Sequence, residues 1–266
     1  MNIGVFDSGF GGLTVLRELL AAIPQADYLY LGDTARLPYG SKSAATIARY
    51  AVSSVEFLVD HGAEYLVIAC NTASALALDE ISSSISADVL GVIEPGARAA
   101  SQITRNNSVC VIGTAATVSS HAYKRQLEKL GINGVEKACP LFVPLVEEGW
   151  IDHPITEQIA RIYLGELASE QKANGGKTAD VLVLGCTHYP LLKPLLHRVL
   201  RDAMQLVDSA EATAHDVADR LALTTLRSHD PQVRFFATDS VEKFQVLGSR
   251  FLGRQINKVE LITLPE

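Results

Sequence analysis

The chain has 266 residues, of which 48% are hydrophobic and 20% are charged, a composition typical of a globular enzyme. A formal net charge of -7 argues against a nucleic-acid-binding surface, which needs clustered Lys and Arg. No apolar run reaches the roughly 18 residues of a membrane span, and the N-terminus lacks a signal-peptide pattern. We therefore expect a cytoplasmic enzyme that binds neither a membrane nor nucleic acid.

Short apolar runs alternate with helical patterns along the chain, which predicts an α/β fold built on mostly parallel sheets. Near-continuous apolar runs are typical of strands covered on both faces. The predicted strands are residues 2–6, 27–31, 65–69, 88–92, 108–112, 181–184, 205–207 and 233–237. The predicted helices are residues 13–22, 42–61, 119–130, 154–173 and 210–223.

Two segments resemble one another, and each places a cysteine directly after an apolar run. Residues 62–74 read GAEYLVIACNTAS and residues 178–190 read TADVLVLGCTHYP. Cys70 and Cys186 each follow a predicted strand and precede a polar pair, Asn-Thr in the first copy and Thr-His in the second. The similarity indicates that the two cysteines occupy equivalent places in two related halves of the protein.

The repeat extends beyond the cysteines and predicts two pseudo-symmetric lobes, each a mostly parallel sheet flanked by helices. In each half a strand leads into a helix, a second strand precedes a proline-bearing loop, and the cysteine strand follows. We expect the first lobe to comprise residues 1–96 and 208–266 and the second to comprise residues 97–207. The active site is expected in the cleft between them.

Polar residues gather where the predicted strands end. Parallel sheets bind ligands at the carboxyl ends of their strands, so two facing lobes would line one cleft with these residues. They are Asp7, Ser8, Asp33, Cys70, Asn71, Thr114, Glu147, Cys186, Thr187 and His188.

Two thiols on opposite sides of one cleft are suited to the racemisation of an amino acid. Inverting the α-carbon requires a base on one face and an acid on the other, because a single group returns the proton to the side it left. A thiol with an ordinary pKa of about 8.5 supplies a usable thiolate fraction near neutrality. Cys70 and Cys186 are therefore the predicted acid/base pair, and Asp7 and His188 are candidate activators.

The other polar groups of the predicted cleft suit an α-amino dicarboxylate. Hydroxyl and amide groups, together with backbone N–H groups at Gly40 and at helix starts, can hold carboxylates without a large positive charge. Asp7 or Glu147 can hold the ammonium group.

At these residues the chain resembles the glutamate racemase family, within the cofactor-independent aspartate/glutamate racemase superfamily. The resemblance covers nearly the whole chain, with several long motifs in the same order. These motifs are VFDSGFGGLTVLREL (5–19), GDTARLPYG (32–40), VIACNTASA (67–75), GTAAT (113–117) and LGCTHYPLL (184–192).

The resemblance implies roles for individual residues. Cys70 acts on the D enantiomer and Cys186 on the L enantiomer, while Asp33 and Glu147 are assisting carboxylates. The implied substrate-binding or supporting residues are Asp7, Ser8, Tyr39, Gly40, Asn71, Thr72, Thr114, Thr117, Thr187 and His188. It further implies no cofactor and no metal, glutamate as substrate, D-glutamate supplied to peptidoglycan synthesis, and a homodimer.

Other functions stay open at this point. The substrate could be aspartate or a related amino acid, because loops that set its length cannot be sized from the sequence. A thiol hydrolase would use Cys186 as nucleophile and His188 as base. A binding module for acidic amino acids would have no use for two strand-end thiols. A pyridoxal phosphate enzyme would need a Schiff-base lysine. Lys193 lies near the second cysteine, but it follows a proline-rich helix start, which argues against this role.

Several conspicuous residues have structural interpretations. Cys110 lies inside an apolar run and Cys139 precedes a proline, so both are predicted to be small buried hydrophobes. The glycines of residues 9–12 lack a nucleotide-binding pattern and predict a tight turn that brings backbone close to the substrate. Trp150 is predicted to pack near Glu147.

Overall fold

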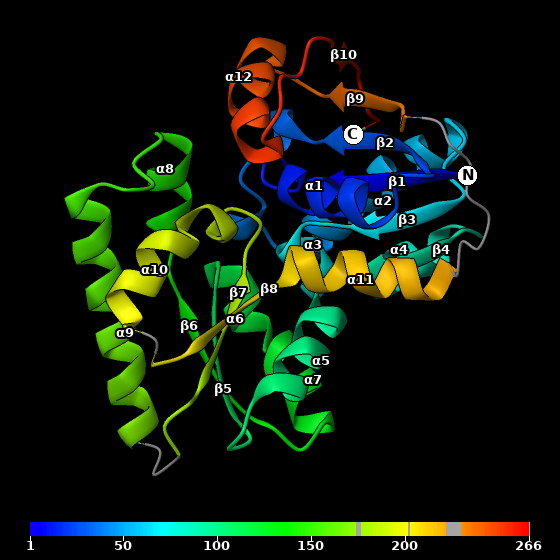
Figure 1. Ribbon diagram of the computed structural model, residues 1–266. Coiled ribbons are helices and arrows are strands. Elements are labelled where there is room, and N and C mark those ends of the chain that lie inside the picture. The colour runs from blue at the N-terminus through cyan, green and yellow to red at the C-terminus, as the bar shows by residue number, and fades with distance from the viewer. Residues whose placement is uncertain (174–176, 202, 222–229, 266) are drawn as a thin grey trace.

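The computed structural model describes residues 1–173, 177–201, 203–221 and 230–265, and its strands form two parallel sheets flanked by helices (Figure 1). The first sheet has the order β10-β9-β2-β1-β3-β4 and the second has the order β6-β5-β7-β8. The predicted α/β class is confirmed. The strands are β1 (Asn2–Asp7), β2 (Asp27–Gly32), β3 (Tyr65–Ile68), β4 (Asp88–Gly91), β5 (Ser108–Gly113), β6 (Asn133–Ala138), β7 (Val181–Gly185), β8 (Gln205–Asp208), β9 (Val233–Ala237) and β10 (Glu260–Leu261).

Helices connect successive parallel strands, as the topology of such sheets requires. The α-helices are α1 (Leu13–Ala22), α2 (Ala44–Asp60), α3 (Asn71–Leu76), α4 (Leu78–Ser84), α5 (Ile93–Ile103), α6 (Ala115–Ser120), α7 (Ala122–Lys129), α8 (Phe142–Glu147), α9 (Pro154–Ala173), α10 (Lys193–Leu200), α11 (Ser209–Leu221) and α12 (Val241–Leu252). Single 3₁₀ turns are η1 (Thr34–Arg36), η2 (Tyr39–Ser41) and η3 (Tyr189–Leu192).

The continuous apolar runs of the central strands reflect burial on both faces. In β7, Leu182 and Leu184 point into one apolar cluster, and Val181 and Val183 point into another on the opposite face. All four side chains are fully buried. Because the side chains of a strand alternate between its faces, a strand covered on both sides must be apolar at every position.

Strands are present at all eight predicted ranges, and the structure adds β10. β6 is the second strand that the repeat predicts before the proline-bearing loop of the second half. Its range could not be predicted because it is an edge strand, with the sequence NGVEKA, that begins on a turn-like Asn-Gly pair and carries charges. β10 is only two residues long and is held by pairing to β9.

One predicted helix is wrong in its continuity. Residues 119–130 were expected to form a single helix, but α6 and α7 meet at His121, which adopts a left-handed conformation with φ 54°. The Ser120 hydroxyl accepts a hydrogen bond from the Ala122 N–H (3.1 Å), so α7 starts anew after the break. For the last predicted helix, residues 222–223 lie outside the described part of the chain.

A shared apolar core joins the two sheets. α1 packs on α11, which follows the last strand of the second sheet and runs beneath the first sheet in Figure 1. One continuous cluster contains Val67 of the first sheet, Leu184 of the second, Leu16 of α1 and Ala214 of α11. Packing therefore fixes the strand ends of one sheet relative to those of the other.

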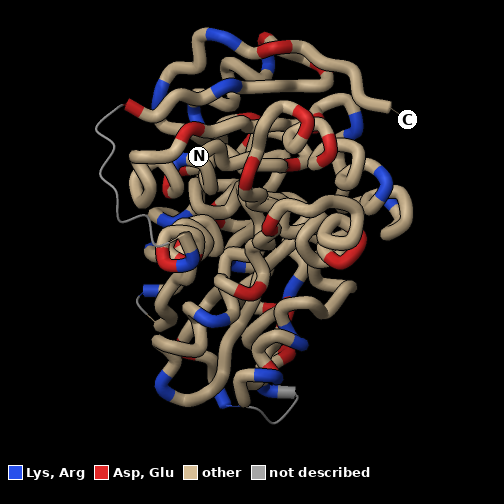
Figure 2. The backbone as a smooth tube through the Cα atoms, turned by 90° about the vertical axis from the view of Figure 1, so that its right-hand side faces the viewer, with Lys and Arg blue, Asp and Glu red and all other residues tan. Residues whose placement is uncertain are grey.

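Charged residues of both signs are interspersed on the backbone from one end of the molecule to the other (Figure 2). In the described ranges, no helix is both long enough and apolar enough to cross a membrane.

The shared core gives a stability prediction. Leu184 is fully buried where the two sheets pack, so Leu184→Ala should lower the free energy of unfolding by about 2–5 kcal/mol through lost contacts and a cavity. The matched control is Leu261→Ala, because Leu261 is 65% exposed and should change stability by less than about 0.5 kcal/mol. Urea unfolding followed by circular dichroism measures both, and equal effects would contradict the assignment of the core.

Candidate active site

The ends of β3 and β5 meet through three threonine hydroxyls. Thr72 Oγ1 lies 3.0 Å from Thr114 Oγ1 and 3.3 Å from Thr117 Oγ1, and the latter two oxygens are 2.9 Å apart. Thr72 lies at the start of α3, and Thr114 caps α6. Gly40 is beside this threonine triad, since a Cβ at Gly40 would stand 3.6 Å from Thr114 Cβ. Four predicted binding residues thus come from both halves of the chain to one place.

The glycine-rich turn of residues 9–12 reaches the second cysteine segment. The Thr14 hydroxyl donates a hydrogen bond to the Thr187 carbonyl (3.0 Å). A Cβ added to Gly11 would lie 2.2 Å from Thr187 Oγ1 and 2.6 Å from His188 Nδ1. No side chain fits in that space, so this close approach requires glycine at position 11. The contact with Thr187 and His188 explains why this turn needs glycine. That the turn also contacts the substrate stays a prediction.

Cys70 follows β3 in the first cysteine segment and caps α3 with its sulfur. The Ala73 N–H donates to Sγ (3.4 Å), and Sγ lies within hydrogen-bonding distance of Ser8 Oγ (3.4 Å). The residue is only 6% exposed. Burial, with a further contribution from the charge of Asp7, raises the pKa of the Cys70 thiol to about 12. Cys70 is therefore a neutral thiol near pH 7.

Two buried polar atoms beside Cys70 have no hydrogen-bond partner among the described residues. Asp7 Oδ2 accepts from the Gly9 N–H (2.8 Å), but Asp7 Oδ1 is unpaired. Asn71 Oδ1 accepts from the Tyr123 hydroxyl (2.7 Å), but Asn71 Nδ2 is unpaired. A buried polar atom without a partner costs about 1–3 kcal/mol, so a ligand that satisfies both atoms is favoured. One atom is an acceptor and the other a donor, which suits the ammonium and carboxylate of an amino acid.

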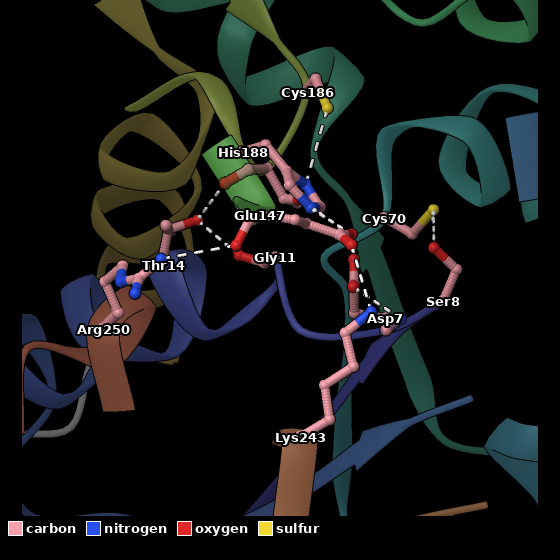
Figure 3. A network of polar contacts seen from close by, with 12 residues as sticks. Asp7, Ser8, Gly11, Thr14, Cys70, Glu147, Cys186, His188, Lys243 and Arg250 are labelled. Carbon is pink, nitrogen blue, oxygen red and sulfur yellow. Dashed lines mark hydrogen bonds and ion pairs between the residues drawn. The ribbon is translucent and has the colours of Figure 1, made fainter. Parts of the chain in front are cut away.

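Cys186 stands in a different polar environment, drawn in Figure 3. Its Sγ lies 4.0 Å from Nδ1 of His188, and the Thr187 hydroxyl lies 3.4 Å from the same nitrogen. Nε2 of His188 is 3.2 Å from Oε1 of Glu147, at the end of α8. Phe251 of α12 packs edge-on against the imidazole, with ring centroids 4.9 Å apart. The imidazole is thus held between a thiol and a carboxylate.

These contacts favour the charged form of His188. Burial lowers the pKa of the imidazole, but hydrogen bonds to Cys186 and Glu147 outweigh it and raise the pKa to about 10. Burial likewise raises the pKa of Glu147, but His188 and Lys243 outweigh it and hold that pKa below its ordinary range. Asp7, whose pKa is raised by burial, also feels the charge of His188. Electrostatic interactions therefore link Cys70 to Asp7, Asp7 to His188, and His188 to Cys186.

Asp33 supports a loop. Its carboxylate is fully buried and accepts hydrogen bonds from the Tyr39 hydroxyl (2.6 Å) and the Thr238 hydroxyl (2.9 Å). Arg36 lies 3.6 Å away from the same carboxylate. These partners fix η1 and η2, and with them Tyr39 and Gly40. Whether Asp33 also assists the reaction stays a prediction.

Several residues outside the predicted set contribute to this site. Tyr123 holds Asn71, Phe251 packs on His188, and Lys243 Nζ lies 3.5 Å from Glu147 Oε2. No motif or spacing in the sequence connects them with the cysteine segments, because only the packing of α7 and α12 brings them there.

The remaining residues singled out in the sequence lie elsewhere. Cys110 and Cys139 are fully buried, while Trp150 is 43% exposed and stacks on His153 with ring centroids 4.6 Å apart. In residues 1–173, 177–201, 203–221 and 230–265, no group of three or more His, Cys, Asp or Glu side chains could hold a metal ion.

Known proteins match this arrangement along almost the full chain. The model of the Asp/Glu/hydantoin racemase family matches residues 3–217. A glutamate racemase of Koribacter versatilis is 52% identical, over 98% of this chain and 97% of that protein. The chain belongs to the Asp/Glu/hydantoin racemase family. The resemblance predicted from the five motifs is confirmed, and membership of this family makes the chain an isomerase.

Solved structures of the racemase family share its fold. A glutamate racemase isoform of Bacillus anthracis superposes with a TM-score of 0.91 at 36% identity, covering 99% of this chain and 97% of that one. A glutamate racemase of Francisella tularensis, solved in complex with D-glutamate, superposes with a TM-score of 0.87 at 35% identity. The match covers 98% of this chain and 97% of that one.

The His188–Glu147 contact gives a pH prediction. Glu147→Gln removes the charge that stabilises the imidazolium, so the pKa of His188 should fall from about 10 towards its ordinary 6.5. In the wild type, the stabilisation that comes from this raised pKa is fully present below pH 6.5 and disappears as the pH rises through about 10. NMR titration of the imidazole measures the pKa in both proteins, and an unchanged value in the variant would refute the coupling.

Proposed function

We propose that this chain is a glutamate racemase that interconverts L- and D-glutamate by proton transfer between two cysteines. The observation that carries the proposal is the pair of cysteine segments, each at the end of a central strand and each beside its own buried ionisable group. Its close relatives over almost the full chain are glutamate racemases.

In the proposed reaction, one sulfur removes the α-proton as a thiolate and the other delivers a proton as a thiol. Starting from L-glutamate, the Cys186 thiolate takes the proton and the Cys70 thiol gives one to the opposite face, which leaves Cys186 protonated and Cys70 as thiolate. The raised pKa of Cys70, about 12, suits it to the acid role in this direction. In the reverse direction, the ammonium group of the substrate beside Asp7 would stabilise the Cys70 thiolate.

His188 and Glu147 would assist at the Cys186 side. A protonated imidazole beside the sulfur is a donor that can exchange a proton with it, and Glu147 stabilises that charge. The positive charge of the imidazolium would also stabilise the carbanion that forms at the α-carbon. A thiol hydrolase would use only this half of the site and would leave Cys70 and Asp7 without a role.

The substrate would be held by the unpaired atoms and the hydroxyl groups. Asp7 Oδ1 would accept from the ammonium group, Asn71 Nδ2 would donate to a carboxylate, and the threonine triad would bind the other acidic end. We further propose that the enzyme is a cytoplasmic homodimer that needs neither cofactor nor metal and supplies D-glutamate for peptidoglycan.

Cysteine substitution tests the mechanism. Cys70→Ala and Cys186→Ala should each reduce racemisation of glutamate by roughly 10²–10⁴-fold, the usual contribution of a general acid or base. Cys110→Ala is the matched control, because Cys110 is also a buried cysteine but lies in the core of the second sheet. Circular dichroism of the glutamate solution measures the rate of racemisation. Near-normal activity of either active-site variant would exclude proton transfer by two thiols.

Isotope incorporation tests whether two bases act. In heavy water at low conversion, D-glutamate formed from L-glutamate should carry deuterium at its α-carbon, while the remaining L-glutamate should carry almost none. A single base would exchange and return the hydrogen on one face, so it would label the recovered substrate as well. Mass spectrometry of the separated enantiomers distinguishes the two.

Substrate choice is tested with the shorter dicarboxylate. L-glutamate should turn over with a kcat/KM at least about tenfold higher than L-aspartate, since a missing methylene is worth roughly 1–3 kcal/mol in a fitted pocket. A preference for aspartate would leave the racemase chemistry intact and refute the choice of glutamate.

A further inference from the structure

The carboxylate of Glu147 is held from two sides. Its Oε1 contacts His188 Nε2 at 3.2 Å, and its Oε2 contacts Lys243 Nζ at 3.5 Å. The backbone carbonyl of Glu147 also accepts a hydrogen bond from Arg250 (3.4 Å). Lys243 therefore binds the oxygen that His188 leaves free, as Figure 3 shows from close by.

The ion pair of Lys243 crosses between the two halves of the molecule. Lys243 lies in the first turn of α12, which follows β9 of the first sheet, whereas Glu147 ends α8, which follows β6 of the second. The Lys243 ammonium lies 5.5 Å from the centroid of the buried Phe10 ring, and Phe251 of the same helix packs on His188. One helix thus contacts both Glu147 and His188.

The ion pair of Lys243 is partly exposed at the start of α12. Glu242 precedes Lys243 in this first turn, so the start of the helix carries charges of both signs. The side chain of Lys243 is 55% exposed, so the pair adds little to the stability of the fold. What the contact does provide is orientation, because the terminal torsion of a glutamate side chain is broad and a second partner restricts it.

We propose that Lys243 is a positioning residue for proton transfer at Cys186. By holding Oε2, it directs Oε1 of Glu147 towards His188, and the imidazole is thereby fixed with Nδ1 facing the Cys186 sulfur. This role rests on the proposed racemase function of the site. Lys243 contacts neither thiol and acts only through Glu147.

If Lys243 acts only through its charge, its removal should change the pKa of His188 in one direction, and if it acts by positioning Glu147, in the other. The groups that face Glu147 are His188 and Lys243, with Arg250 at its carbonyl, and those that face His188 are Cys186, Thr187, Glu147 and Asp7. The positive charge of Lys243 by itself opposes protonation of the nearby imidazole. Ordering of the carboxylate by Lys243 favours that protonation. Removing Lys243 should therefore lower the pKa of His188 if positioning dominates and raise it if only charge matters.

The first experiment measures His188 directly and needs no substrate. NMR titration of the imidazole in wild type and Lys243→Met should give a lower pKa in the variant, and Lys243→Arg should restore most of the difference. A higher or an unchanged pKa in Lys243→Met would overturn the proposal, whichever amino acid the enzyme acts on.

The second experiment measures turnover of glutamate. Lys243→Met should lower kcat about two- to fivefold with little change in KM, since a half-exposed ion pair has an effect of this size. Lys243→Arg should recover activity, and Arg254→Met, which removes the same charge from an exposed site just beyond α12, should leave it unchanged. Equal activity of Lys243→Met and wild type would overturn the proposal. An inactive wild type would instead refute the glutamate racemase function, and the titration would still decide on Lys243.

Discussion

The contact between the strand ends of the two sheets is the constraint on which the site depends. A core shared through α1 and α11 holds the sheets together, and the triad of Thr72, Thr114 and Thr117 joins the ends of β3 and β5. In the proposed reaction, proton transfer from both faces of one carbon needs bases held at fixed positions on opposite sides. Cys70 and Cys186, which follow β3 and β7, would meet that need better than residues of mobile loops, because packing sets the positions of the strands.

The two halves are alike in fold and differ in charge. Cys70 has a buried carboxylate and a serine beside it, and its sulfur caps a helix. Cys186 has an imidazole backed by Glu147 and Lys243. The raised pKa values of Cys70 and His188 have different origins. Burial itself raises the pKa of the Cys70 thiol, whereas burial lowers that of His188 and the contacts with Cys186 and Glu147 outweigh it. A pseudo-symmetric scaffold therefore carries two chemically distinct thiols.

Local patterns predicted the strands and the cysteine segments because burial on both faces leaves a strong apolar signal. The apolar signal could not give the range of β6, which only the repeat predicted, because its charged edge sequence resembles a turn. It also could not predict the break at His121, which depends on hydrogen bonds of Ser120 and Glu136. The spacing of the motifs predicted that most of the polar residues lie at the strand ends. It did not predict Tyr123 or Lys243, because these side chains join the site through helix packing and belong to no repeated segment.

The first sheet is built from both ends of the chain. β1 to β4 come from residues before 92, whereas β9 and β10 come from residues 233–261, after all of the second sheet. During synthesis, β2 is therefore an open edge until residues 233–237 leave the ribosome, and an open edge can pair with another chain. The helix that carries Lys243 is also made after the whole second sheet. The surroundings of Cys186 are thus completed only after both cysteine segments have been made.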